Sequence, residues 1–301
     1  MTLCTGRFAP TPTGPLHFGS LLAAVASYCD ARHAGGQWLL RLEDIDPPRE
    51  MPGAAATILR QLEAYGLHWD GPVLYQSQRT EAYVAAIDAL EAKGLLFWCR
   101  CSRSALAGHT VYPGTCREHR RPEPDAAIRL RVEPGTVCFH DRVFGDQQED
   151  VAATVGDFVI RRRDGLFAYQ LAVVVDDAMQ GVTHVVRGAD LLDNTARQIY
   201  LQAQQGYPTP CYAHIPLAVN ALGEKLSKQN FARALPVDHP EPILWEALRT
   251  LGQNPPTELT DAPVSEQLGW ATAHWSLAAI PRRMLLDPGG RFADGPGFQG
   301  G

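Results

Sequence analysis

Short apolar runs of strand length alternate with helical segments along much of this chain, and this alternation most constrains its fold. The first strand is expected over residues 1–8 and the first helix over 17–34, which Gly35 and Gly36 end. Further elements follow the same alternation: strands at 37–42, 73–75, 171–175 and 184–192, and helices at 52–65, 79–93 and 193–205. Short buried strands separated by helices favour a mostly parallel sheet covered on both faces. We therefore expect an α/β fold.

Two regions depart from the alternation. Residues 97–150 have weak periodicity and are dominated by Cys, Arg, Pro and His, which indicates an insertion. The C-terminal part is proline-rich, and its last segment, DPGGRFADGPGFQGG, has too few apolar residues to pack. We predict an α/β domain formed by residues 1–96 and 165–235, an inserted subdomain at 97–164, and a short helical region at 236–301 with a loose tail.

Composition excludes several classes of protein. The net charge of -6 argues against indiscriminate nucleic-acid binding, although residues 100–131 and 161–163 are locally basic. Seven cysteines, an odd number without a signal peptide, do not indicate a disulfide framework. No apolar run approaches the length of about 20 residues that spans a bilayer. We expect a cytoplasmic protein, and a monomer by default.

The stretch RFAPTPTGPLHFGS, residues 7–20, lies between the first strand and the first helix. Ligands of open parallel sheets bind at the carboxyl ends of strands, and a helix N-terminus there suits phosphate. Three prolines stiffen the loop, while Gly14 allows close backbone approach. His17 can donate a hydrogen bond to a phosphoryl oxygen, and Gly19 leaves room for a base or ribose. Taken alone, the stretch is equally typical of a structural turn.

A second candidate phosphate site is GEKLSKQN, residues 223–230. Lys225 and Lys228 flank a small apolar and a hydroxyl residue behind a glycine. Such a loop can bring two ammonium groups onto a polyphosphate. Taken alone, it is also typical of an exposed basic loop.

Three cysteines of the insertion, Cys99, Cys101 and Cys116, have spacing typical of a metal site. A tetrahedral zinc site needs a fourth ligand, for which Tyr112, His109 and His119 are candidates. Imidazole is the commoner zinc ligand. Buried, inert thiols are the alternative interpretation.

Five motifs in order give the chain a specific resemblance over residues 5–235. HFGS and KLSKQ resemble the HIGH and KMSKS signatures of class I aminoacyl-tRNA synthetases, and RFAPTPTGPLHFGS resembles the glutamyl/glutaminyl branch. RLEDIDPPRE, YQSQR and VVRGADLLDNTARQ extend the resemblance. It implies a Rossmann-type parallel-sheet catalytic domain with an inserted zinc-binding, acceptor-type subdomain and a short helical C-terminal stub.

The resemblance assigns a glutamate site. The matching residues are Arg7, Phe8, Ala9, Pro10, Thr11, Glu43, Tyr169 and Arg187. Arg7 would pair with the γ-carboxylate, for which a planar guanidinium is selective. Glu43 would bind the α-ammonium, and Thr11 would add a contact through its hydroxyl or backbone. Glutamine lacks the charge that makes the arginine pairing worthwhile, so glutamate is the expected substrate.

The resemblance also assigns an ATP site and the metals. His17, Gly19 and Lys228 would bind ATP, and His17 and Lys228, assisted by Lys225, would stabilise the phosphoryl charge of adenylate formation, with Mg²⁺ accompanying ATP. Short members of the family use a C-x-C…Y-x-x-x-C arrangement. It predicts one structural Zn²⁺ on Cys99, Cys101, Tyr112 and Cys116.

The chain departs from glutamyl-tRNA synthetases in two ways. Ser20 replaces the second histidine of HIGH and Gln229 the last serine of KMSKS, both mild changes for adenylate formation. Only 72 residues follow Gln229, too few for the usual anticodon-reading domains. These features resemble the glutamyl-queuosine tRNA(Asp) synthetases, which activate glutamate without tRNA and transfer it to queuosine, the modified wobble base of tRNA(Asp).

Three alternatives stay open. The first is a truncated glutamyl-tRNA synthetase that charges the 3′ end of tRNA(Glu). The second is a nucleotide- or RNA-binding regulator that has lost catalysis. The third, a small-molecule adenylyltransferase, ranks last because it leaves Arg7, Glu43 and Arg187 without a role.

Overall fold

A computed structural model of the chain describes residues 3–219 and 233–286. Its centre is a parallel sheet whose strands are β1 (Thr5–Phe8), β2 (Gln37–Leu42), β3 (Leu74–Tyr75), β9 (His184–Gly188) and β10 (Cys211–Ile215). β2 lies between β1 and β3, and β9 pairs with β10 in parallel. Thr183 N donates to Thr5 O at 2.9 Å, which brings β1 and β9 side by side. The predicted α/β fold with a parallel sheet is confirmed.

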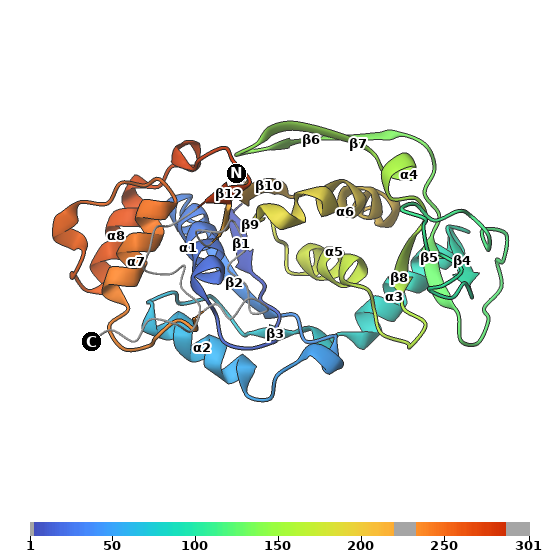
Figure 1. The fold of residues 1–301 in the computed structure, drawn as a ribbon, viewed down its shortest axis with the longest axis horizontal. Coiled ribbons are helices and arrows are strands. Elements are labelled where there is room, and N and C mark those ends of the chain that lie inside the picture. The colour runs from blue at the N-terminus through green and yellow to red at the C-terminus, as the bar shows by residue number, and fades with distance from the viewer. Residues whose placement is uncertain (1–2, 220–232, 287–301) are drawn as a thin grey trace.

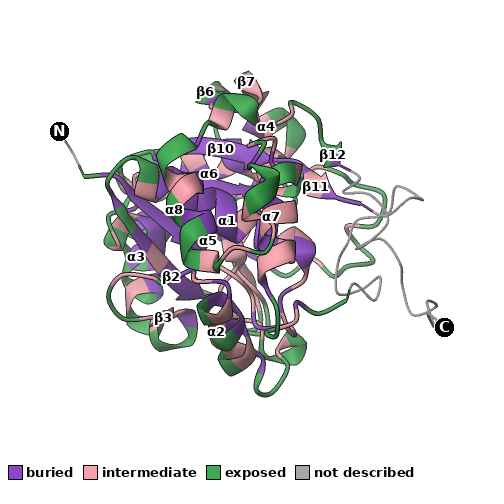
Figure 2. Ribbon diagram, turned by 90° about the vertical axis from the view of Figure 1, so that its left-hand side faces the viewer, coloured by how far each residue is buried: buried purple, intermediate pink, exposed green. Residues whose placement is uncertain are grey.

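Helices cover both sides of these strands (Figure 1). α1 (Phe18–His33) packs on β1 and β9, and α7 (Glu241–Thr250) and α8 (Val264–His274) cover its outer side. The remaining long helices are α2 (Ala54–Ala64), α3 (Thr80–Ala92), α5 (Tyr169–Met179) and α6 (Leu192–Gln205). Figure 2 shows that α1 and the central strands are largely buried. The proline-rich C-terminal region thus packs on α1 through α7 and α8.

One predicted element is wrong in type. Residues 171–175, expected as a strand, belong to helix α5, which packs against α3, α6 and β8 (Phe158–Arg161). Every residue from Gln170 to Asp177 is buried, so α5 has no solvent-exposed face there. A short apolar run without a polar face cannot be told from a buried strand by its periodicity.

The predicted insertion contains two antiparallel units. β4 (Leu96–Cys99), β5 (Ala127–Leu130) and β8 form one small sheet. The hairpin of β6 (Thr136–Asp141) and β7 (Gly145–Asp150), followed by α4 (Val151–Thr154), instead extends the central sheet, because β6 pairs with β10 in parallel. Part of the predicted insertion therefore belongs to the central sheet. The domain limits themselves stay a prediction.

Short 3₁₀ helices, labelled η, and two short strands complete the fold. They are η1 (Pro47–Arg49), η2 (Gln76–Gln78), η3 (Ala189–Leu191), η5 (Thr257–Leu259), η6 (Leu277–Ala279), β11 (Leu217–Ala218) and β12 (Leu285–Leu286). The strand expected over 184–192 ends at Gly188, and η3 begins at Ala189. In the described ranges, helices long and apolar enough to cross a membrane are absent.

Candidate active site

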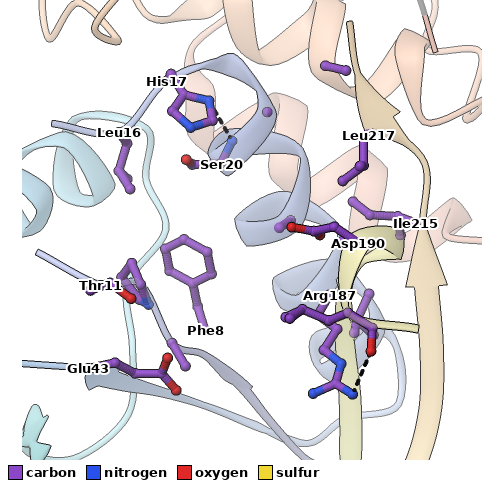
Figure 3. A pocket seen from close by; sticks show the side chains of 18 of the residues that line it. Phe8, Thr11, Leu16, His17, Ser20, Glu43, Arg187, Asp190, Ile215 and Leu217 are labelled. Carbon is purple, nitrogen blue, oxygen red and sulfur yellow. Dashed lines mark hydrogen bonds between the residues drawn. The ribbon is translucent and has the colours of Figure 1, made fainter. Parts of the chain in front are cut away.

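A cavity of about 790 Å³ opens at the carboxyl ends of β1, β2, β9 and β10. The structure brings together there the predicted residues Arg7, Phe8, Ala9, Pro10, Thr11, His17, Gly19, Glu43, Tyr169 and Arg187. In Figure 3, Glu43 and Arg187 lie on opposite walls, and His17 and Ser20 lie at the other end of the pocket. The residues predicted for the amino acid and for the phosphates thus share one cavity.

The two predicted lysines lie outside the described residues. Lys225 and Lys228 fall in the segment between 219 and 233. The described residues on either side both reach the site, because Ala218 lines the cavity and Ala234 forms a β-bridge with His17.

The proline-rich loop is fastened by a buried glutamine of α2. Gln61 Oε1 accepts from Leu16 N at 2.7 Å, while its Nε2 donates to Leu235 O at 2.8 Å. The loop is also tied to the segment after β2, since Glu43 N donates to Pro10 O at 3.0 Å. Gly14 has a φ of 144°, which a side chain would strain. These contacts fix the position of His17 relative to Glu43.

His17 is the N-cap of α1. Its Nδ1 accepts from Ser20 N at 3.3 Å. A neutral imidazole that accepts at Nδ1 carries its proton on Nε2, so the ring is a donor at its other nitrogen. The helix N-terminus adds its partial positive charge at the same place. This end of the cavity therefore suits an anion.

A buried network of charges underlies the opposite end of the cavity. Asp177 of α5 lies 3.4 Å from Arg7 Nε and 2.7 Å from Arg41 NH1. Arg41 NH2 lies 3.6 Å from Glu43 Oε1. Burial alone would raise the pKa of Asp177, but Arg41 and Arg7 offset this and hold it below its ordinary value. Asp177 is therefore ionised and neutralises part of the arginine charge.

Glu43 has an unusual protonation equilibrium. Burial raises its pKa to about 7, although Arg41 and Arg7 act in the opposite direction. A carboxyl group with a pKa near 7 is partly protonated and partly ionised at neutral pH. A cation bound beside it would favour the ionised form, so Glu43 can serve as a receptor for an ammonium group.

Arg187 of β9 is buried and held by acceptors of its own chain. Its NH1 donates to Gln198 Oε1 at 2.8 Å, its NH2 to Thr195 Oγ1 at 2.9 Å, and its Nε to His214 Nε2 at 3.0 Å. Tyr169 begins α5 beside it, and burial raises the pKa of that phenol. This end of the pocket thus combines the buried guanidinium groups of Arg7 and Arg187 with the carboxyl group of Glu43.

Several functional positions were not predicted from the sequence. Arg49, Ser20 and Asp190 line the cavity. Arg49 and Asp190 each lie in a quoted motif, RLEDIDPPRE and VVRGADLLDNTARQ, so their motifs were the available signal. Asp177 carried no such signal, because its position under Arg7 depends on α5 being a helix.

The three cysteines of the insertion converge. The sulfur atoms of Cys99, Cys101 and Cys116 lie within 4.8 Å of one another, and Cys101 and Cys116 are 3.6 Å apart. Four ligands at about 2.3 Å around a tetrahedral zinc give sulfur separations of about 3.8 Å, so the spacing fits a metal. The Tyr112 oxygen lies 3.4 Å from Cys99 Sγ. Among the described residues, ring nitrogens of His109 and His119 do not join this group.

Comparisons with known proteins show the family to which the chain is similar. The family model "tRNA synthetases class I (E and Q), catalytic domain" matches residues 4–252. A protein named glutamyl-Q tRNA(Asp) synthetase from Thiobacillus denitrificans is 58% identical, covering 94% of this chain and 97% of its own. One of the same name from Ectopseudomonas mendocina is 57% identical, covering 95% and 97%.

Solved structures agree with the fold. A glutamate-tRNA synthetase from Elizabethkingia anophelis superposes with a TM-score of 0.78 at 24% identity, covering 94% of this chain and 68% of its own. A glutamate tRNA ligase from Elizabethkingia meningosepticum gives a TM-score of 0.80 at 23% identity, covering 95% and 68%. At this identity the likeness supports the fold.

Proposed function

The chain belongs to the class I tRNA synthetases of the glutamate and glutamine branch, and from this premise we propose that it activates L-glutamate with ATP and transfers it to queuosine of tRNA(Asp). It is then a ligase that forms glutamyl-adenylate without needing tRNA. The observation that carries the proposal is the identity of 58% and 57% with proteins of that name, over nearly the whole length of each. With tRNA as its acceptor, it would act in the cytoplasm, as a monomer.

Glutamate binding uses the charges at one end of the cavity. Arg7, held by Asp177, pairs with the γ-carboxylate, and Glu43 receives the α-ammonium. Arg187 and Tyr169 contact the glutamate from the facing wall. The rest of the pocket is formed by Thr11 and by the backbone of Phe8, Ala9 and Pro10. The γ-carboxylate of glutamate carries a charge that pairs with a guanidinium group, whereas the amide of glutamine is neutral, so the pocket favours glutamate.

Activation joins glutamate to the α-phosphate of ATP. A glutamate α-carboxylate oxygen forms a bond to the α-phosphorus, the bond from that phosphorus to the bridging oxygen breaks, and pyrophosphate leaves with the electron pair. Gly19 gives room beside the nucleotide, and His17 donates from Nε2 to a phosphoryl oxygen. Lys228 and Lys225 add positive charge, and Mg²⁺ comes with ATP. Catalysis is positioning and electrostatic stabilisation.

Transfer consumes the adenylate. A hydroxyl of the cyclopentenediol ring of queuosine attacks the glutamyl carbonyl, the new ester forms, and AMP leaves. The acyl–phosphate bond breaks as the ester forms, AMP leaves with that electron pair, and the hydroxyl proton passes to the departing phosphate. The anticodon loop must therefore reach the same cavity that holds the adenylate.

The insertion would hold one structural zinc ion. Three thiolates and a phenolate from Cys99, Cys101, Cys116 and Tyr112 supply the four ligands. Metal of this kind contributes folding free energy to segments that are poor in apolar residues.

Labelled glutamate separates the proposal from its competitors. The protein is incubated with ATP, [¹⁴C]glutamate and tRNA pools that contain or lack queuosine. We expect label on tRNA(Asp) in the queuosine-containing pool alone. Label on tRNA(Glu), or labelling indifferent to queuosine, would identify a truncated glutamyl-tRNA synthetase. Absence of glutamate-dependent pyrophosphate exchange would favour a binding protein.

A further inference from the structure

Arg187 contacts neutral groups at each of its nitrogens. Its acceptors are a ring nitrogen of His214, the Gln198 amide oxygen, the Thr195 hydroxyl oxygen and the Leu191 carbonyl oxygen. Unlike Arg7, it has no ion pair with a carboxylate of the described residues. A ligand carboxylate could therefore contact this guanidinium directly, provided that His214 stays neutral and accepts at Nε2.

Asp141 sets the state of His214. The two side chains are fully buried, and His214 Nδ1 lies 2.6 Å from Asp141 Oδ2. Because Asp141 can only accept, His214 must donate from Nδ1, and this leaves Nε2 as the acceptor that Arg187 requires. Burial, and then the neighbouring Arg187 charge, lower the pKa of His214, which keeps the ring neutral.

The strand register places Asp141, His214 and Arg187 side by side, and we call the contacts from Asp141 through His214 to Arg187 the relay. His214 of β10 is the partner of Arg187 of β9, and Tyr212 of β10 is the partner of Asp141 of β6. Asp141 and His214 themselves do not line the cavity. They belong to elements about 70 positions apart. His214 Nε2 contacts Arg187 Nε at 3.0 Å and Thr195 Oγ1 at 3.2 Å, and of these two residues Arg187 lines the cavity.

We propose that Asp141 and His214 are positioning residues that fix the Nε of Arg187 and thereby set the affinity for glutamate. The inference deepens the proposed function and rests on its assignment of the pocket to glutamate. Losing one charged hydrogen bond at Arg187 is expected to raise the glutamate KM by about tenfold or more. The KM for ATP and kcat should change little, because neither residue faces the phosphates.

Asp141→Asn tests the relay with almost no change in volume. Asp141 Oδ1 accepts from the backbone N–H groups of Val143, Phe144 and His214. In Asp141→Asn these three donors should orient the amide so that its oxygen takes the place of Oδ1. The amide NH₂ then faces His214 Nδ1. The ring must accept there and carry its proton on Nε2, opposite the N–H of Arg187. The substitution therefore inverts the tautomer of His214.

Two measurements follow the inversion. ¹⁵N NMR of the ligand-free protein, with His214→Gln to identify the His214 signals, should show the proton on Nδ1 in the wild type and on Nε2 in Asp141→Asn. Glutamate-dependent pyrophosphate exchange should show the increase in glutamate KM. Unchanged KM alongside an inverted tautomer would overturn the proposal.

A double-mutant cycle separates positioning from a structural role of Asp141. Gln at 214 can offer its amide oxygen to Arg187 without help from Asp141, whereas Leu cannot. We expect His214→Gln to keep the glutamate KM within about threefold and His214→Leu to raise it about tenfold or more. Asp141→Asn should add no further KM increase in the His214→Gln background. Equal increases in both backgrounds would refute the relay.

The His214 pair keeps the proposal testable if Asp141→Asn fails to fold. Equal glutamate KM values for His214→Gln and His214→Leu, with melting temperatures close to that of the wild type, would then refute it. Failure of the proposed function is a separate result, because the wild type itself would show no glutamate-dependent exchange while the NMR tautomer could still be measured.

Discussion

Asp177 lies beneath Arg7 and accepts from its Nε at 3.4 Å, although 170 positions separate the two residues. The same carboxylate pairs with Arg41 at 2.7 Å, and Arg7, Arg41 and Asp177 are all at least 95% buried. One carboxylate therefore holds two guanidinium groups inside the protein. The base of the proposed glutamate pocket depends on this arrangement.

Asp177→Asn should destabilise the fold strongly. The variant leaves two buried guanidinium charges without their shared partner, and breaking a buried pair in this way costs about 3–5 kcal/mol. Urea denaturation measures the loss. Asp164→Asn, which removes an exposed partner of Arg162, is the matched control and should cost no more than about 1 kcal/mol. Equal losses for the two variants would contradict the network.

Arg7→Ala should raise the glutamate KM by at least about tenfold, because a charged, bidentate contact with the γ-carboxylate is lost. The ATP KM should stay close to the wild-type value. Pyrophosphate exchange measures both constants. Arg60→Ala, an exposed arginine of α2, serves as the control. A glutamate KM equal to that of the control would reject the γ-carboxylate role.

The architecture was predictable from the sequence where apolar runs alternate with periodic helices, as in β1, α1 and β2. Arg7 lies in β1, Glu43 directly follows β2, and His17 caps the helix after β1, so their meeting at one sheet edge could also be inferred. Helix α5 could not be predicted from the sequence, because a helix buried on every side lacks the alternation of polar and apolar residues that reveals a helical period.

Long-range contacts account for the rest of the site. Asp177 reaches Arg7 only once α5 is packed, and Asp141 reaches His214 only because β6 joins β10. Neither relation has a local pattern in the sequence. The positions of Lys225 and Lys228 lie outside the described residues and remain predictions.

Purified protein should contain about one equivalent of zinc, held by Cys99, Cys101, Cys116 and Tyr112. Cys101→Ser should reduce the zinc content to less than about half an equivalent and lower the melting temperature, since the metal contributes folding free energy. Elemental analysis and thermal scans measure these effects. Cys138→Ser, at an exposed cysteine outside the cluster, should leave both unchanged.

Tyr112→Phe distinguishes the fourth ligand. The variant keeps the ring that lies under Arg129 but removes the oxygen next to the thiols. It should lose zinc to a competing chelator faster than the wild type, whereas His119→Ala and His109→Ala should not. Faster loss from a histidine variant alone would transfer the ligand role to that histidine.

Glutamate binding should weaken as the pH falls below 7. Burial raises the pKa of Glu43 to about 7, and only the ionised carboxylate attracts the α-ammonium of the substrate. At saturating MgATP, kcat/KM for glutamate should therefore fall about tenfold from pH 8 to pH 6, since that ratio reports ionisations of the free enzyme. Glu43→Gln should have a low and flat profile, because it has no carboxyl to titrate. A profile for Glu43→Gln that falls as steeply as that of the wild type would assign the titration to another group.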